Sequence, residues 1–164
     1  MSPEEICRGL GETKVKAIFA ELTVDAMKKV LREAKIPTTR MPTHTSTKRR
    51  NEDWARRIWH LLAEKPASTA AATLIFEWLT RARRLMLAEF LSGIGCQHDN
   101  GLTDADFMKD STSEKMAEIG KSLLDKHERS EVAAYLLFLD ATNQSEHFKD
   151  LGLEALLKTA SAAA

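Results

Sequence analysis

The sequence predicts an all-α protein, a multi-helix bundle with an N-terminal basic helix-loop-helix subdomain. Three observations favour this fold class. The 164 residues include only seven glycines and four prolines, the alternation of apolar and polar residues that is typical of strands is nearly absent, and apolar residues recur three and four positions apart along most of the chain. The length is sufficient for one core that needs no metal or disulfide support.

The N-terminal part of the chain contains four expected helices. Two short helices are predicted at 3–10 and 14–21, and Thr23 is a good N-cap for the third. Residues 37–50 combine two prolines with five threonines and a serine, which predicts a loop or flexible tether. The fourth helix is expected to begin at Asn51, whose side chain favours the N-cap position.

Pro66 marks a candidate boundary. Residues 1–65 are expected to form a basic helical subdomain and residues 66–164 an acidic helical bundle. One long helix is predicted from Thr69 to Ile94, because Gly95 is a typical C-terminal stop. Apolar residues cover well over half of this helix, so we expect it to be mostly buried. Its solvated stripe is expected to include Glu77, Arg81 and Arg84.

Further helices are expected beyond Gly95. They are predicted over residues 113–126, from a cap at Ser130 through an apolar centre, and over residues 153–159. The pair Asn100-Gly101 is expected at the tightest point of the turn that precedes them.

Cysteine usage and hydropathy restrict the class of protein. Cys7 and Cys96 are isolated and far apart, which argues against a structural zinc site and fits a reducing compartment. No apolar run approaches the length of a membrane span. We therefore expect a soluble cytoplasmic protein with no membrane partner and no cofactor.

Positive charge is concentrated between Lys28 and Arg57. This segment holds ten Lys and Arg residues and only three acidic ones, whereas the whole chain has no net charge. Residues 1–65 carry a net charge of +5 and residues 66–164 a net charge of −5. This pattern indicates either an external polyanion or attraction between the two parts of the chain.

The same segment resembles the SAP motif, a helix-loop-helix module of many chromatin, repair and RNA-associated proteins. The resemblance covers residues 22–58. It is carried by Leu22-Thr23-Val24, Met27-Lys28, Leu31, Ile36-Pro37-Thr38-Thr39 and Arg57-Ile58, with Trp54 in place of a leucine. Lys35 and Arg40 stand where the family has glycines, and the loop is longer. The resemblance implies binding to DNA or RNA.

The residues themselves also favour an anion site. A helix that begins at Asn51 behind Lys48-Arg49-Arg50 directs backbone N–H groups and cations at one point, which suits a phosphate. Few side chains suit base edges, so we expect low sequence selectivity. Trp54, Trp59 and Trp78 are expected as core anchors. The predicted contact residues are Lys28, Lys29, Arg32, Arg40, Lys48, Arg49, Arg50 and Arg57.

Two alternatives to a non-enzymatic nucleic-acid-binding protein are open. The first is a protein-interaction or regulatory module in which the basic segment docks an acidic partner, including the acidic part of a second copy in a homo-oligomer. The second is a metal-dependent HD-type phosphohydrolase. His60, His98-Asp99 and Asp140 resemble the metal ligands of that family in order and spacing, although the His-Asp pair is expected in a turn.

Overall fold

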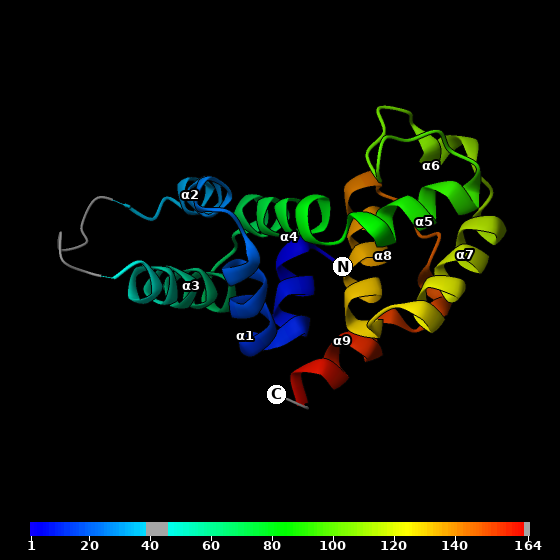
Figure 1. Ribbon diagram of the computed structural model, residues 1–164. Coiled ribbons are helices and arrows are strands. Elements are labelled where there is room, and N and C mark those ends of the chain that lie inside the picture. Colours follow the sequence, from blue (N-terminus) through cyan, green and yellow to red (C-terminus); the bar gives the residue numbers. More distant parts are fainter. Residues whose placement is uncertain (39–45, 163–164) are drawn as a thin grey trace.

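The structure is a computed structural model that describes residues 1–38 and 46–162, and it confirms an all-α bundle. Figure 1 shows α2 and α3 at one end of the molecule and α6 at the other. The helices are α1 (Pro3–Glu21), α2 (Val24–Glu33), α3 (Thr47–Glu64), α4 (Ser68–Ala82), α5 (Arg84–Ile94), α6 (Phe107–Asp110), α7 (Ser113–Lys126), α8 (Arg129–Asn143) and α9 (Leu153–Ala162), with a 3-10 turn η1 (Lys149–Leu151) before α9.

The α1 helix has an internal break at Gly11. Its φ of 80° and ψ of 168° belong to a region that only glycine adopts readily, so the two predicted N-terminal helices become two arms of one element. The first arm begins with a capping box, in which the side chain of Ser2 accepts a hydrogen bond from the Glu5 backbone and the Glu5 carboxylate accepts one from the Ser2 backbone. The break allows α1 to pack against α3, α4, α8 and α9.

The single helix predicted from Thr69 to Ile94 is wrong. The structure divides it at Arg83, whose φ of −126° and ψ of 26° separate α4 from α5. No glycine or proline marks this position. The guanidinium of Arg83 instead contacts Glu21 on α1 and Glu131 on α8, and it lies 5.1 Å from the ring centroid of Trp78. These distant partners explain why a local pattern did not reveal the break.

Two other local predictions have different outcomes. Asn100 and Gly101 both have positive φ, and Asp99 and Leu102 exchange backbone hydrogen bonds across them, so the predicted tight turn is confirmed. The predicted cap at Ser130 is wrong, because α8 already begins at Arg129 with Glu128 in the N-cap position. The hydroxyl of Ser130 donates to the Glu128 carboxylate.

The hydrophobic core runs through both parts of the chain. Trp54, Ile58 and Leu62 from α3 belong to the same buried cluster as Trp78 from α4 and Phe90 from α5. Trp54 and Trp78 are core anchors, as predicted, and Trp59 packs partly buried against the cluster. The division into residues 1–65 and 66–164 stays a prediction. Within the described ranges, no helix has the length and apolar character needed to cross a membrane.

Candidate nucleic-acid interface

The α2 helix presents a cationic outer face. Ala26, Met27, Val30 and Leu31 are buried against the core, which leaves the side chains between them on the solvent side. Lys28 and Arg32 are exposed and lie one turn apart. Neither forms an ion pair with any other residue in 1–38 or 46–162. These two cations are therefore available to an external anion.

Lys29 is engaged with α4. Its Nζ lies 2.6 Å from Oε1 of Glu77 and 5.9 Å from the ring centroid of Phe76. Glu77 is 5% exposed, which contradicts the predicted solvated position, and it also accepts a hydrogen bond from Arg81 at 2.8 Å. The hydrogen bond from Lys29 is the main cause of a lowered pKa for the Glu77 carboxyl. Lys29 thus joins α2 to α4 and is still half exposed.

The α3 helix begins earlier than predicted. Ser46 is its N-cap and accepts a hydrogen bond from the Arg49 backbone N–H at 3.3 Å, so the expected start at Asn51 is wrong. Serine and asparagine are similarly good N-cap residues. A start at Ser46 gives α3 about one more helical turn than a start at Asn51 would. Lys48 and Arg49 are consequently exposed in the first turn of α3, which contains no acidic residue.

Two further predicted contact residues have partners on α3 itself. Arg50 lies 4.7 Å from the ring centroid of Trp54 and donates to the side-chain oxygen of Asn51. Arg57 lies 2.6 Å from Asp53, which also pairs with Arg56. Arg50 and Arg57 contact residues of the same helix, so their charges are less available to an external anion than those of unpaired cations.

The predicted set therefore divides into three groups. Lys28, Arg32, Lys48 and Arg49 are exposed without an ion-pair partner among the described residues, whereas Lys29, Arg50 and Arg57 have partners. Arg40 lies outside the described residues. Both helices that carry the first group lie at the same end of the molecule (Figure 1).

Part of the charge separation is used within the fold. Lys14 on α1 lies 2.5 Å from Glu128 and 2.9 Å from Glu131, and Lys29 pairs with Glu77. Cations of the basic part thus bind carboxylates of the acidic part, as one of the two interpretations of the charge pattern predicted. This attraction does not account for the four exposed cations Lys28, Arg32, Lys48 and Arg49 of α2 and α3, which have no ion-pair partner among the described residues.

The residues of the metal-hydrolase alternative do not converge. His60 pairs with Glu64 on the outside of α3, and Asp140 accepts hydrogen bonds from Ser145, His147 and Phe148 at the end of α8. No group of three or more His, Cys, Asp or Glu side chains in the described part of the chain could hold a metal ion.

Two serine–histidine contacts were not predicted from the sequence. His98 accepts a hydrogen bond from the Gly101 N–H at Nδ1, so its Nε2 carries the proton and donates to Ser92 Oγ at 2.8 Å. A ring in that tautomer is not a base for the serine. Ser113 lies 2.7 Å from His147 Nδ1. Ser113 and His147 are 34 residues apart, and Ser92 and His98 are six residues apart across the end of α5.

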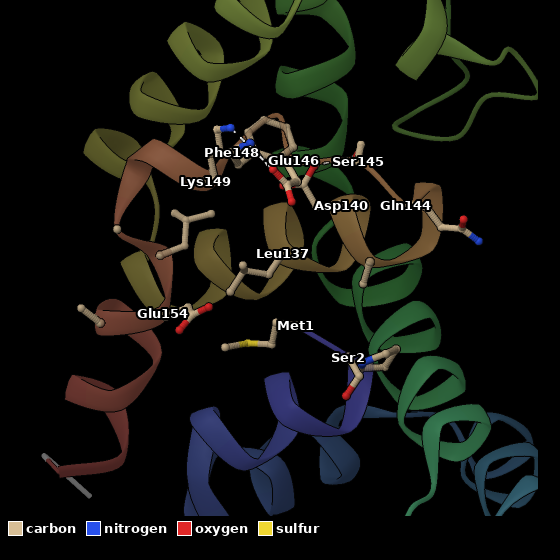
Figure 2. Close-up of a pocket in the computed structure, with 15 residues that line it drawn as sticks. Met1, Ser2, Leu137, Asp140, Gln144, Ser145, Glu146, Phe148, Lys149 and Glu154 are labelled. Carbon is tan, nitrogen blue, oxygen red and sulfur yellow. Dashed lines mark hydrogen bonds and ion pairs between the residues drawn. The ribbon is translucent and has the colours of Figure 1, made fainter.

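An open pocket of about 1040 Å³ lies between the start of α1, the end of α8 and the start of α9. Figure 2 shows Asp140, Glu146 and Lys149 on one side of it and Met1 on the other. The Asp140 carboxylate is occupied by the loop that follows α8, and Glu146 pairs with Lys149 at 3.5 Å. These polar groups hold the chain around η1, so they do not form a prepared ligand site.

No family model matches the chain, and comparison with curated proteins and with solved structures gives no match. Functional inference therefore depends on the geometry and charge of the residues described above.

Proposed function

We propose that this protein binds DNA or RNA through cations on α2 and at the start of α3, with low sequence selectivity and without catalysis. The proposed contact residues are Lys28, Arg32, Lys48 and Arg49. Each is exposed, and none has an ion-pair partner in the described part of the chain.

The observation that carries this proposal is the first turn of α3. Cations near a helix N-terminus are opposed by the helix dipole, at a cost of about 0.3–1 kcal/mol each. Lys48 and Arg49 occupy that turn with no acidic residue to compensate them. A phosphate bound there would interact favourably with both cations and with the free N–H groups of the turn. The arrangement is unfavourable for the free helix and favourable for an anion complex.

Low selectivity follows from the kind of side chain that is available. Lysine and arginine on exposed helical turns bind phosphates regardless of the base, and phosphate contacts fix position without reading sequence. The α2 and α3 surfaces that carry these cations hold few amides that could form paired hydrogen bonds with base edges.

Fluorescence anisotropy with labelled DNA and RNA oligonucleotides at low salt tests the proposal. The double variant Lys48→Glu with Arg49→Glu should lose binding by at least tenfold, because two attractive contacts become repulsive. The matched control reverses Lys121 on α7 and Arg129 in the first turn of α8, both exposed. If both double variants bind as the unmodified protein does, or if that protein does not bind at micromolar concentration, the proposal is wrong.

An acidic protein surface is the second candidate partner, favoured by one observation. Asp104, Glu114 and Glu118 are exposed without an ion-pair partner among the described residues, near the α6 and α7 end that lies opposite α2 and α3 (Figure 1). Two copies could therefore associate head to tail. Light scattering at low salt should then give a mass above that of one chain, which high salt reduces. A constant monomer mass excludes association between copies of this chain.

A further inference from the structure

The place where α2 meets α4 combines a cation with an exposed aromatic ring. Lys29 Nζ lies 2.6 Å from Glu77 Oε1 and 5.9 Å from the ring centroid of Phe76, the residue next to Glu77 on α4. Glu77 is itself fixed by Arg81. The buried carboxylate thus holds the ammonium group of Lys29 beside the Phe76 ring.

Phe76 is exposed although its neighbours on α4 are not. Its side chain is 51% exposed, whereas Ile75 and Trp78 are at most 1% exposed. Of the three tryptophans, Trp54 is buried like Trp78, and Trp59 is partly buried. Phe76 is therefore the large aromatic side chain that the basic end of the molecule presents to solvent within the described residues.

An aromatic ring beside cations is the arrangement that single-stranded nucleic acids recognise. Bases of a single strand can stack on a protein ring while the backbone phosphates contact lysine and arginine, and this recognition tolerates any sequence because every base has a π-face. Bases in a duplex are already stacked on one another, so they do not stack on an exposed phenylalanine. Arg32 follows Lys29 by one helical turn, which continues the cationic face along α2.

We propose that the surface shared by α2 and α4 binds single-stranded nucleic acid, with a base stacked on Phe76 and the adjacent phosphates on Lys28 and Arg32. This inference rests on the proposed nucleic-acid function and specifies its substrate class. The cations at the start of α3 then contact the same strand further along.

The test compares strands and duplexes of one length. Fluorescence anisotropy is measured with a labelled 20-nucleotide oligo-dT, an oligo-U of the same length and a mixed-sequence duplex of 20 base pairs. The unmodified protein should bind the single strands more tightly than the duplex. Phe76→Ala should weaken single-strand binding roughly tenfold, the effect expected for one lost stacking contact, and should leave duplex binding unchanged.

Two further variants make the result specific to stacking. Leu85→Ala is the matched control, because Leu85 is 68% exposed on α5 and loses a similar apolar side chain; it should bind as the unmodified protein does. Phe76→Trp should keep single-strand affinity, and its added indole fluorescence should be quenched by oligo-dT, since a ring in contact with a base loses emission.

The outcomes separate the two proposals. If single strands and duplex bind equally and Phe76→Ala changes neither, the stacking surface is wrong and the nucleic-acid function stands. The stacking surface is equally wrong if Phe76→Trp binds oligo-dT without quenching. If no oligonucleotide binds, both proposals are wrong. Selective loss of single-strand binding in Phe76→Ala, with Leu85→Ala unaffected, supports both, and the ratio of oligo-dT to oligo-U affinity then distinguishes DNA from RNA.

Discussion

Arg83 and Glu131 form a two-point ion pair at the break between α4 and α5. Nε of Arg83 lies 2.5 Å from Oε2 of Glu131, and Nη2 lies 2.6 Å from Oε1. Such paired geometry is the strongest form of arginine–carboxylate contact. Lys14 of α1 binds the same carboxylate, so the pair joins α1 and α8 to the break.

This ion pair predicts acid sensitivity. Burial alone would raise the pKa of the Glu131 carboxyl, but hydrogen bonds from Arg83 and Lys14 and their charges lower it to about 2. A carboxyl with a lowered folded-state pKa stabilises the fold above its unfolded pKa near 4.5, and that contribution is lost as the pH falls towards 2. The shift corresponds to roughly 3 kcal/mol.

The variant Glu131→Gln tests this prediction. It should lower the midpoint of thermal unfolding at pH 7 by roughly 5–10 °C, because two cations lose their shared carboxylate. Its stability should also change less than that of the unmodified protein between pH 4.5 and pH 2. Denaturant unfolding at several pH values measures both effects. Equal pH dependence in the two proteins would contradict the assignment to Glu131.

Gly101 and Gly152 allow the steric cost of a Cβ atom to be separated from the cost of a left-handed backbone. Both have a left-handed backbone, with φ of 83° and 64°. A Cβ atom at Gly101 would lie 2.6 Å from the carbonyl oxygen of Arg84, whereas one at Gly152 would meet nothing within 4 Å. Gly152→Ala should therefore cost about 1–2 kcal/mol for the backbone alone.

Gly101→Ala should cost clearly more than Gly152→Ala, because the turn at Asn100-Gly101 must also move away from α5. Chemical denaturation of the two variants measures the difference, which isolates the steric contact from the backbone conformation. Equal losses of stability would show that the turn is not held tightly against α5.

The sequence predicted those features that local residues determine. The tight turn was predicted because Asn and Gly readily adopt the left-handed backbone that it requires. Two helices were predicted at 3–10 and 14–21, and the gap between them includes Gly11, where α1 breaks. The break at Arg83 was not, because arginine is a good helix former and its partners Glu21 and Glu131 lie 62 and 48 residues away. Helical periodicity reports only on residues close in sequence, so it cannot predict contacts between residues this far apart.

The sequence predicted only part of the candidate site, because some of its features depend on contacts between distant residues. Exposure of Lys28 and Arg32 follows from their place between the apolar positions of the amphipathic α2. Lys48 and Arg49 were predicted in a loop, and the structure places them in the first turn of α3. The pairing of Lys29 with Glu77 depends on how α2 packs against α4, so periodicity placed Glu77 in solvent instead. The start of α3 was misplaced because Ser46 and Asn51 are both good caps, and only the folded chain selects one.

The salt dependence of binding should report the number of cations in contact. For the four exposed cations of α2 and α3, the logarithm of the binding constant should fall with the logarithm of salt concentration with a slope of about −3 to −4. Lys48→Gln with Arg49→Gln should reduce the magnitude of this slope by roughly 1.5–2, since two phosphate contacts are removed. Anisotropy titrations between 50 and 300 mM salt give the slope. A slope near zero would exclude phosphate contacts as the source of affinity.

The start of α3 should show a conflict between stability and binding. Ser46 is the N-cap and Arg49 is the third residue of the helix, so Arg49→Glu completes a capping box and replaces an unfavourable charge with a favourable one. The free protein should gain about 1 kcal/mol of stability, seen as a rise of roughly 2–4 °C in the unfolding midpoint, while nucleic-acid affinity falls. Arg129→Glu in the first turn of α8 is the control for charge reversal and should leave nucleic-acid affinity unchanged. If Arg49→Glu lowers both stability and binding, the arginine serves the fold, and the argument that its position is maintained for an external anion is wrong.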